Sequence, residues 1–155
     1  FNGEKADYDN AFGTCVNLAK EILTREISKA IERVALAHAV EGIYQSAEDK
    51  RIIVFDQKYP WEGVLQKFPE PLFAVYESKE NNNWNAKAVP TDSDKLFTVR
   101  KQFPESWAGK RGLELATATG VSDAIFCHNA RFIVVAKSKE GILELVRLAL
   151  KEELE

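Results

Sequence analysis

The first third of the chain carries apolar residues three and four positions apart, which is the pattern of an amphipathic helix. The pattern predicts a helix over residues 9–45, with Asp9 or Asn10 capping its first turn. Its apolar positions are Phe12, Cys15, Val16, Ala19, Ile22, Leu23, Ile27, Ala30, Ile31, Val34 and Ala37. Such a helix would be about 50 Å long, whereas a globule of this size is roughly 40 Å across. The helix therefore either breaks, after Thr24 or near Gly42, or extends beyond its own domain, where its apolar face needs a partner.

The remainder of the chain, residues 50–155, carries shorter patterns. Runs of β-branched and aromatic residues predict strands at 51–56, 71–77, 84–89, 124–128 and 132–137. A polar stretch over 91–95 leads into the apolar residues of 97–100. Turn residues separate two pairs of these strands, at Asn81–Asn83 and at Asn129-Ala130. The first of these turns predicts a hairpin.

Three further helices are expected in this region. A short one begins at Pro60-Trp61, because proline fits the first helical turn, and another runs from Gly112 to Thr119 and is ended by Gly120. Ser138 is expected to cap a final amphipathic helix over 139–150. The elements predict an α+β fold for residues 1–155, with a long N-terminal helix, a small, mostly antiparallel sheet and a C-terminal amphipathic helix.

Composition narrows the class of protein. The 155 residues are 45% hydrophobic and 29% charged, as in one ordinary globular domain. With 21 basic and 24 acidic residues the net charge is −3, which excludes a histone-like polycation. No apolar run predicts a membrane span, no signal peptide is recognised, and Cys15 and Cys127 suggest neither a disulfide framework nor a zinc module, so a cytoplasmic location is expected. The chain begins Phe1-Asn2 and lacks methionine, which indicates a processed chain or a domain of a longer protein.

Basic residues are concentrated in one part of the sequence. Residues 95–139 hold eight bases and three acids, a net charge of +5, which leaves −8 for the remainder. Such a segment either binds an anionic ligand or forms a solvated basic face. The start of the last helix is one candidate anion site, since its free N–H groups lie beside Lys137, Ser138 and Lys139. Other candidates are the bidentate donors Arg100 and Arg111, and the pair His128 and Arg131, which bracket the preceding turn.

No self-sufficient catalytic group stands out. The glycines form no G-x-G-x-x-G and no Walker loop, and Ser122 lacks the glycines of a nucleophile elbow. Cys127 and His128 are adjacent on a predicted strand and point to opposite faces, so they cannot easily share a metal. For His38 a structural role is expected, whereas for His128 a structural and a ligand-binding role remain open. The tryptophans are expected to be packing residues: Trp61, Trp84 and Trp107.

The order of several short motifs resembles a known family. These motifs are Pro60-Trp61, Asn83-Trp84, Val89-Pro90, Arg100, the run Phe103-Pro104-Glu105-Ser106-Trp107-Ala108-Gly109-Lys110-Arg111, the run Gly120-Val121-Ser122-Asp123-Ala124-Ile125-Phe126-Cys127-His128-Asn129, Phe132-Ile133 and Lys137–Gly141. Together they resemble the C-terminal half of the MYG-type (melanocyte-proliferating-gene) family over nearly the whole chain. That family is related to the Asp-His-His (DHH) phosphoesterases, and its members are described as metal-dependent hydrolases or RNA exonucleases.

The resemblance implies different roles for the two halves of such proteins. The metal-binding residues of such proteins belong to an N-terminal half, so a divalent metal, expected to be Mn, would be held there and none in this chain. This chain would then be the substrate-side or accessory domain, partnered by that metal-binding domain and by a nucleotide or nucleic acid. Its candidate substrate-binding residues are Arg100, Trp107, Arg111, His128, Asn129, Arg131, Lys137 and Ser138. The alternative is an interaction module without a ligand, which forms a homodimer through its first helix.

The sequence departs from the family at two places. Relatives usually carry paired glycines where this chain has Val134-Val135, and a leucine where it has Lys110. Glycines let a backbone approach a phosphate closely, whereas two valines favour a strand and crowd that approach. Phosphate binding by that loop is therefore in question.

Overall fold

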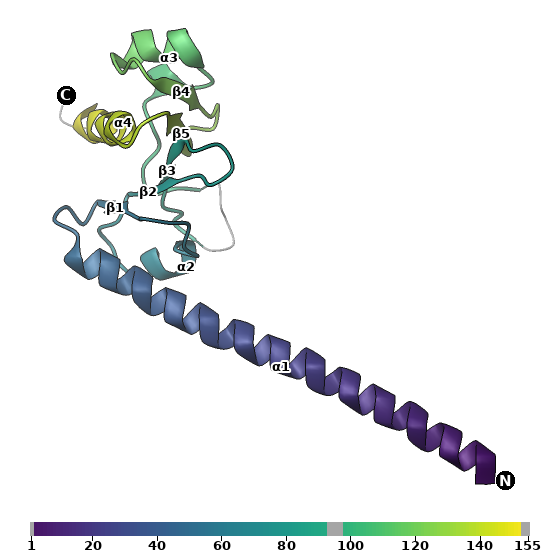
Figure 1. Cartoon of the computed structure of the whole chain (residues 1–155). Helices are drawn as coiled ribbons and strands as arrows, with labels where there is room; N and C mark the ends of the chain where they lie inside the picture. The colour runs from purple at the N-terminus through teal and green to yellow at the C-terminus, as the bar shows by residue number, and fades with distance from the viewer. Residues whose placement is uncertain (1, 93–97, 153–155) are drawn as a thin grey trace. The chain divides into compact units, whose positions relative to one another are not determined.

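A computed structural model of the protein describes residues 2–92 and 98–152, apart from the side chains of residues 2–4 and 6. Its elements in chain order (Figure 1) are α1 (Asn2–Ser46), β1 (Ile52–Val54), α2 (Glu62–Leu65), β2 (Phe73–Glu77), β3 (Trp84–Ala88), the 3₁₀ helix η1 (Glu105–Trp107), α3 (Gly112–Thr119), β4 (Ala124–Cys127), β5 (Ile133–Ala136) and α4 (Lys139–Lys151). The α+β class predicted from the sequence is confirmed. The stretches expected over 91–95 and 97–100 lie in part outside the described residues.

Helix α1 is one continuous helix, which corrects the predicted cap and excludes the alternative of a break. It is already helical at Asn2, so Asp9 and Asn10 do not cap it, and it breaks neither after Thr24 nor near Gly42. Residues 2–9 contain no proline and include good helix formers, so the helix extends through them. The chain divides into two compact units, one ending at Leu36 and one beginning at Ala37, so the boundary falls within α1.

The second unit is built on a five-stranded sheet in the order β1-β2-β3-β5-β4. Strands β2, β3, β5 and β4 pair in antiparallel fashion, whereas β1 and β2 are parallel and are joined through α2. The hairpin between β2 and β3 was predicted from its asparagine turn, in which Asn82 has a φ of 53°. The strands are shorter than predicted: β1 covers three residues of the expected 51–56.

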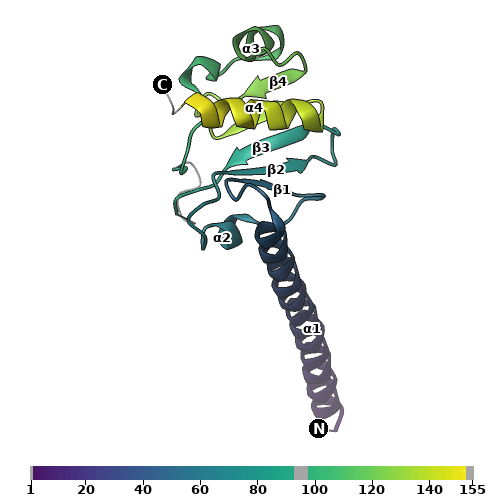
Figure 2. The same cartoon turned by 90° about the vertical axis from the view of Figure 1, so that its left-hand side faces the viewer.

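Each face of the sheet contributes to a different hydrophobic cluster. On one face α4 packs across the strands (Figure 2), and its Ile142, Leu145 and Val146 are fully buried against residues such as Phe73 and Val134. On the other face, near β1 and β2, the last turns of α1 and helix α2 cover the sheet. Their cluster comprises Val40, Tyr44, Ile53, Phe55, Trp61, Val64, Leu65, Ala74 and Val89. These helices leave the part of that face formed by β3, β5 and β4 uncovered. Asn85, Ile133 and Val135 are half-exposed there.

The helix ends follow the sequence signals. Gly120 ends α3 with a φ of 75°, and the Ser138 hydroxyl accepts a hydrogen bond from Gly141 N at 3.0 Å at the start of α4. Trp61 and Trp107 are buried, which confirms the prediction that they are core residues. None of the helices, within the described residues, is long and apolar enough to span a membrane.

Both cysteines are free thiols, Cys15 exposed and Cys127 buried. Burial raises the pKa of the Cys127 thiol to about 11, so little thiolate exists at pH 8. We expect iodoacetamide to modify Cys15 at pH 8 much faster than Cys127 in the folded protein, and unfolding in urea to abolish the difference. Peptide mapping by mass spectrometry measures both rates. Equal rates in the folded protein would show that Cys127 is not protected.

Candidate functional site

The segment after η1 runs along the outer edge of β4. Cys127 N donates to Lys110 O at 3.0 Å, and Arg111 forms an antiparallel bridge with Phe126. Arg111 has an extended backbone, with φ −138° and ψ 150°, before α3 begins at Gly112. The segment therefore fixes the exposed Arg111 side chain beside the strand that carries Phe126 and leads into His128.

A row of four side chains starts at this arginine. The Arg111 guanidinium carbon lies 4.6 Å from the centre of the Phe126 ring, and the Phe126 and His128 ring centres are 6.0 Å apart in an edge-to-face arrangement. The His128 and Phe132 ring centres are 4.5 Å apart. We call Arg111, Phe126, His128 and Phe132 the basic–aromatic row. Its three rings are half-exposed and its guanidinium is exposed, so a ligand can reach it.

A tight turn sets the orientation of His128. Arg131 N donates to His128 O at 2.8 Å, and Ala130 N donates to the ring nitrogen Nδ1 of His128 at 3.0 Å. Arg131 closes the turn with a φ of 57°. Because Nδ1 is an acceptor here, the neutral ring carries its proton on Nε2, which is then the nitrogen that can donate to a ligand.

Asn129 also belongs to this turn and is exposed. Its Oδ1 lies 3.4 Å from the point where a Cβ on Gly109 would sit, and Gly109 has a φ of 71°. The turn and the segment before Arg111 thus approach each other closely. The fold brings Arg111, His128 and Asn129 into one neighbourhood.

Two predicted arginines are engaged elsewhere. The Arg100 guanidinium donates to three backbone carbonyls in the segment after α2, those of Phe68 at 2.5 Å, Gln66 at 2.9 Å and Pro71 at 3.0 Å. The Arg131 guanidinium donates to Gln102 Oε1 at 2.7 Å and to Phe103 O at 3.4 Å. These bonds favour loop-stabilising roles for both side chains, so we leave them out of the proposed site.

The start of α4 already holds an anion from the chain itself. The Asp123 carboxylate oxygen Oδ2 accepts hydrogen bonds from Ser138 N at 2.8 Å and from the Ser138 hydroxyl at 2.5 Å. A Cβ on Gly141 would collide with the same carboxylate. A phosphate would have to displace Asp123 to use these donors, so the proposed site does not include Ser138. Lys137 is exposed and stays a candidate.

The basic segment 95–139 does not form one patch in the described structure. Lys139 lies over the Trp84 ring at 5.4 Å, Lys110 donates to Ser106 O at 2.5 Å, and Lys95 lies outside the described residues. Trp107 is 4% exposed and packs on Phe103, so its ring is not a stacking surface. Within the row itself, the positive charge is that of Arg111.

The departure at Val134-Val135 has a structural explanation. Both residues lie in β5, where Val134 is fully buried and pairs with Ala86 and Cys127. The valines therefore fill the middle of the sheet, as their β-branched side chains favour. In this chain the segment is a strand and not a phosphate loop.

Phe126 and Phe132 were not predicted to belong to the site. Alternation along a strand places Phe126 and His128 on one face, and this signal could have identified Phe126. Phe132 joins through the turn geometry, which the sequence does not encode locally.

A small cavity of ≈ 220 Å³ opens on the half-exposed sheet face, lined in part by Tyr76, Asn85 and Ile133.

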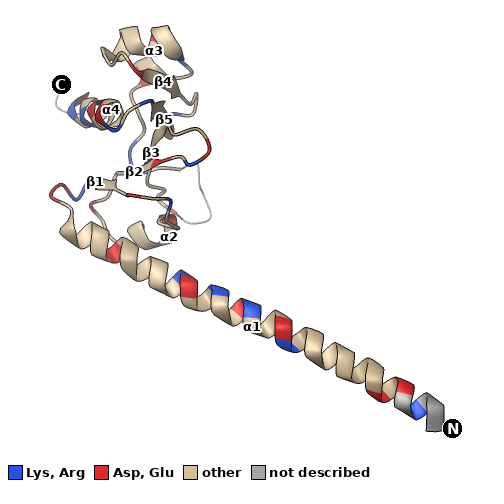
Figure 3. Cartoon of the chain, viewed as in Figure 1, with Lys and Arg blue, Asp and Glu red and all other residues tan. Residues whose placement is uncertain are grey.

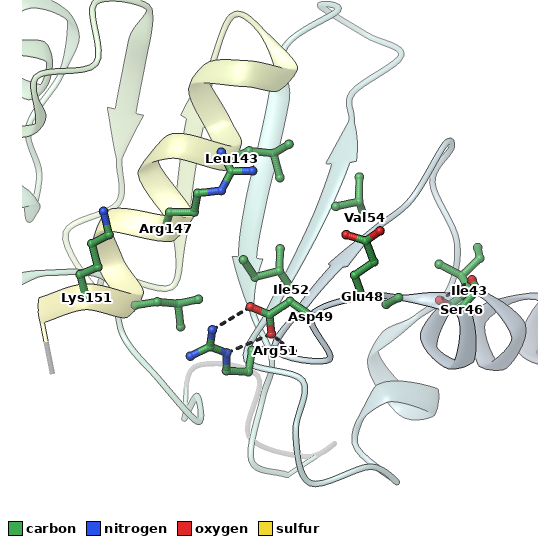
Figure 4. A pocket seen from close by; sticks show the side chains of 12 residues that line it. Ile43, Ser46, Glu48, Asp49, Arg51, Ile52, Val54, Leu143, Arg147 and Lys151 are labelled. Carbon is green, nitrogen blue, oxygen red and sulfur yellow. Dashed lines mark hydrogen bonds and ion pairs between the residues drawn. The ribbon is translucent and has the colours of Figure 1, made fainter. Parts of the chain in front are cut away.

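A larger cavity of ≈ 560 Å³ lies between α4, β1 and the end of α1 (Figure 4). Leu143, Ile52 and Val54 line its apolar part, and Arg51 donates to both Asp49 oxygens at 2.9 and 2.7 Å. These hydrogen bonds from Arg51 lower the pKa of the Asp49 carboxyl below its usual value. None of the residues predicted for the site lines this cavity. Arg51 and Asp49 already pair with each other.

Metal ligands are not assembled in the described part of the chain. Within residues 2–92 and 98–152, no three His, Cys, Asp or Glu side chains lie close enough together to hold a metal ion. His38 is exposed on α1 with Nδ1 3.7 Å from Glu41, and His128 is bonded within its own turn. The described residues do not fit a divalent metal.

Residues 1–150 match the family model MYG1_exonuc, which is described as "Uncharacterised protein family (UPF0160)". This chain belongs to the MYG1 family. The resemblance carried by the short motifs is thereby confirmed. Similar proteins include a MYG1 protein of Chlamydia muridarum, 40% identical over 97% of this chain and 52% of its own length, and one of Schizosaccharomyces pombe, 32% identical over 97% and 49%.

A human protein named "MYG1 exonuclease" is 30% identical over 60% of this chain and 26% of its own length. The comparison with solved structures found no match. Several MYG1 relatives match nearly the whole of this chain. The chain spans about half of the length of each of them.

Proposed function

We propose that this chain is the substrate-side domain of a nuclease-related MYG1 protein and that it contacts the nucleotide or nucleic-acid substrate through the basic–aromatic row. The observation that carries the proposal is the row itself, an exposed guanidinium followed by three half-exposed rings. The name of the human relative, an exonuclease, supports the substrate class. The relation to DHH phosphoesterases implied by the motifs is part of the same proposal.

The row offers the two contacts that a single-stranded nucleic acid needs. A guanidinium can donate two parallel hydrogen bonds to a phosphate, and Arg111 is held in place by its bridge to Phe126. The half-exposed rings offer faces or edges on which bases stack, a contact worth about 1–3 kcal/mol per base. The His128 Nε2–H adds a donor, and Asn129 adds an amide beside it.

Hydrolysis of a phosphodiester in this family is expected to use a divalent metal, which generates a nucleophilic water. Since the described residues do not fit such an ion, we place it outside them and derive no step through it. The relatives are about twice as long as this chain, so they have room for a metal-binding half. In this scheme the present chain binds and orients the substrate and performs no bond cleavage itself.

Binding of a labelled single-stranded RNA or DNA oligonucleotide to the 155-residue chain tests the proposal. We expect Arg111→Gln to weaken binding about tenfold at low salt, because one charge-assisted phosphate contact is lost. The slope of log affinity against log salt should become shallower by about 0.7, the value for one phosphate of a single strand. Fluorescence anisotropy at several salt concentrations measures both quantities.

Arg147→Gln is the matched control. It removes the same charge from an exposed arginine on α4, whose side chain is 59% exposed. This variant should keep the affinity and salt slope of the unchanged chain. Equal weakening by both substitutions would mean that only net charge matters, and no binding at low salt by the unchanged chain would refute the proposed function.

A further inference from the structure

Seven residues of α1 form a straight apolar stripe that is separate from the proposed site. They are Phe12, Val16, Ala19, Leu23, Ile27, Ala30 and Val34. All lie in the unit that ends at Leu36, and the large side chains are exposed: Phe12 by 72%, Leu23 by 61%, Ile27 by 59% and Val34 by 58%. Val16 is half-buried. A stripe of this length, about 33 Å at 1.5 Å per residue, is long enough for a continuous helix–helix contact.

The spacing of the stripe has two properties that define a partner. Phe12, Leu23 and Val34 are eleven residues apart, and eleven residues are close to three helical turns, so the stripe stays on one side of a nearly straight helix. The steps between its members are four, three, four, then four, three, four, which is symmetric about Leu23. A symmetric stripe matches a second copy of itself running in the opposite direction, because a two-fold axis through Leu23 maps the pattern onto itself.

We propose that α1 pairs with α1 of a second copy of this chain in an antiparallel arrangement centred on Leu23. In this register Phe12 lies opposite Val34 of the second copy, Val16 opposite Ala30, and Ala19 opposite Ile27. Each of these layers combines a larger side chain with a smaller one. Alternating sizes let the two stripes fill the space between the helices without gaps or overlap.

The parallel arrangement packs less well. It would place Phe12 on Phe12, Ala19 on Ala19 and Ala30 on Ala30, so one layer is overfilled and two layers leave cavities. It would also align the two helix dipoles, whereas the antiparallel arrangement opposes them. Packing and electrostatics therefore both favour the antiparallel pair.

Charge along the helix agrees with this register. Within the stripe no charged residue interrupts the apolar positions. Acidic and basic residues follow one another along the middle of α1 (Figure 3). Seven residues beyond the two ends of the stripe the sequence carries opposite charges, Lys5 and Glu41. The antiparallel register places each Lys5 opposite a Glu41, whose carboxylate also lies 3.7 Å from His38 and 3.8 Å from Lys67 of its own chain. A parallel register would place like charges together.

The area is sufficient for a specific contact. Two stripes contribute eight large exposed apolar side chains and two half-buried valines, and burying each of the eight removes on the order of 100 Å² from water. Cys15, Ile22 and Ile31 flank the stripe and add to this area. The total reaches the range of about 1,200–2,000 Å² that stable specific interfaces bury.

Oxidative cross-linking of variants with one exposed cysteine tests both the pairing and its direction. Cys15→Ser removes the exposed thiol, while the buried Cys127 stays in place. In that background we expect Leu23→Cys to form a disulfide-linked dimer in high yield, because residue 23 faces its own copy at the two-fold axis. Val34→Cys alone should stay monomeric on a denaturing gel, whereas an equimolar mixture of Phe12→Cys and Val34→Cys should form the mixed dimer.

Sedimentation of the unchanged chain complements the cross-linking. We expect a dimer at micromolar concentration, and Leu23→Asp should shift it to monomer while the near-ultraviolet spectrum of the second unit is retained. Self-cross-linking of Val34→Cys as strong as that of Leu23→Cys would show a parallel pair and overturn the register. A chain that stays monomeric at 100-fold higher concentration would overturn the proposal and leave the stripe to another partner, such as the other half of a MYG1 protein.

Discussion

Trp107→Ala is expected to lower the free energy of unfolding by about 3–5 kcal/mol. The Trp107 ring is 4% exposed, lies 6.2 Å from the Phe103 ring at an interplanar angle of 21°, and belongs to the main hydrophobic cluster under α4. Truncation removes this contact area and leaves a cavity that the surrounding sheet cannot close. Urea denaturation followed by near-ultraviolet circular dichroism measures the change.

The same variant separates a core role from a substrate-contacting one. Oligonucleotide affinity, measured at a temperature where the variant is still folded, should change less than for Arg111→Gln. Leu113→Ala is the control for stability, because Leu113 is 83% exposed on the neighbouring α3 and its truncation should cost less than about 0.5 kcal/mol. A stable Trp107→Ala protein with weakened binding would return Trp107 to the candidate site.

Gly141→Ala is expected to destabilise the protein by about 1–3 kcal/mol, the usual cost of inserting a group into filled space. The added Cβ would collide with the Asp123 carboxylate, which holds Ser138 through two hydrogen bonds at the start of α4. The collision would push the carboxylate away from those donors and weaken the cap. Thermal or urea unfolding measures the loss.

A double-mutant cycle identifies the cause. Asp123→Ala removes the carboxylate, so Gly141→Ala in that background should cost much less than in the unchanged chain, with a coupling of 1 kcal/mol or more, on the order expected for groups in contact. Additive effects would mean that the loss arises from the backbone of Gly141 and not from the carboxylate. Gly63→Ala is a matched control, since no atom other than those of its chain neighbours and its own helix backbone lies within 4 Å of a Cβ placed there.

Features written in short stretches of sequence were predicted well. The bounds of α3, the left-handed Gly120 after it and the Ser138 cap of α4 each depend on residues within one turn of one another. The hairpin between β2 and β3 likewise follows from its asparagine turn. Local hydrogen bonds and backbone preferences determine these features, so a single sequence contains the signal.

Features that depend on distant partners were not predicted. The parallel pairing of β1 with β2 requires the crossover through α2. The sequence pattern of neither strand indicates this pairing. Asp123 and Ser138 are fifteen residues apart in sequence and meet only when β4 and β5 pair. Arg100 was predicted to contact phosphate because its chemistry suits an anion, but three backbone carbonyls satisfy the same donors in the fold.

The candidate site was predicted in part. Arg111, His128 and Asn129 were selected from charge and motif, and the fold brings them into one neighbourhood. Trp107 belongs to the same motif, but sequence order alone does not distinguish a buried tryptophan from an exposed one. Whether a side chain is buried depends on the whole fold. A shared motif therefore indicates which residues lie near one another, but not which of them contact substrate.

The two outer strands of the sheet differ in how they are protected from other chains. The outer edge of β4 is occupied by the Arg111 segment, whereas β1, at the opposite end of the sheet, pairs with no further strand of the described residues. β1 has three residues and follows the charged pair Asp49 and Arg51, and short edges flanked by charge resist strand-to-strand association. Concentrated solutions of this protein should therefore gain no β-structure, and infrared spectra across a concentration series should keep one amide I profile even as molecules associate.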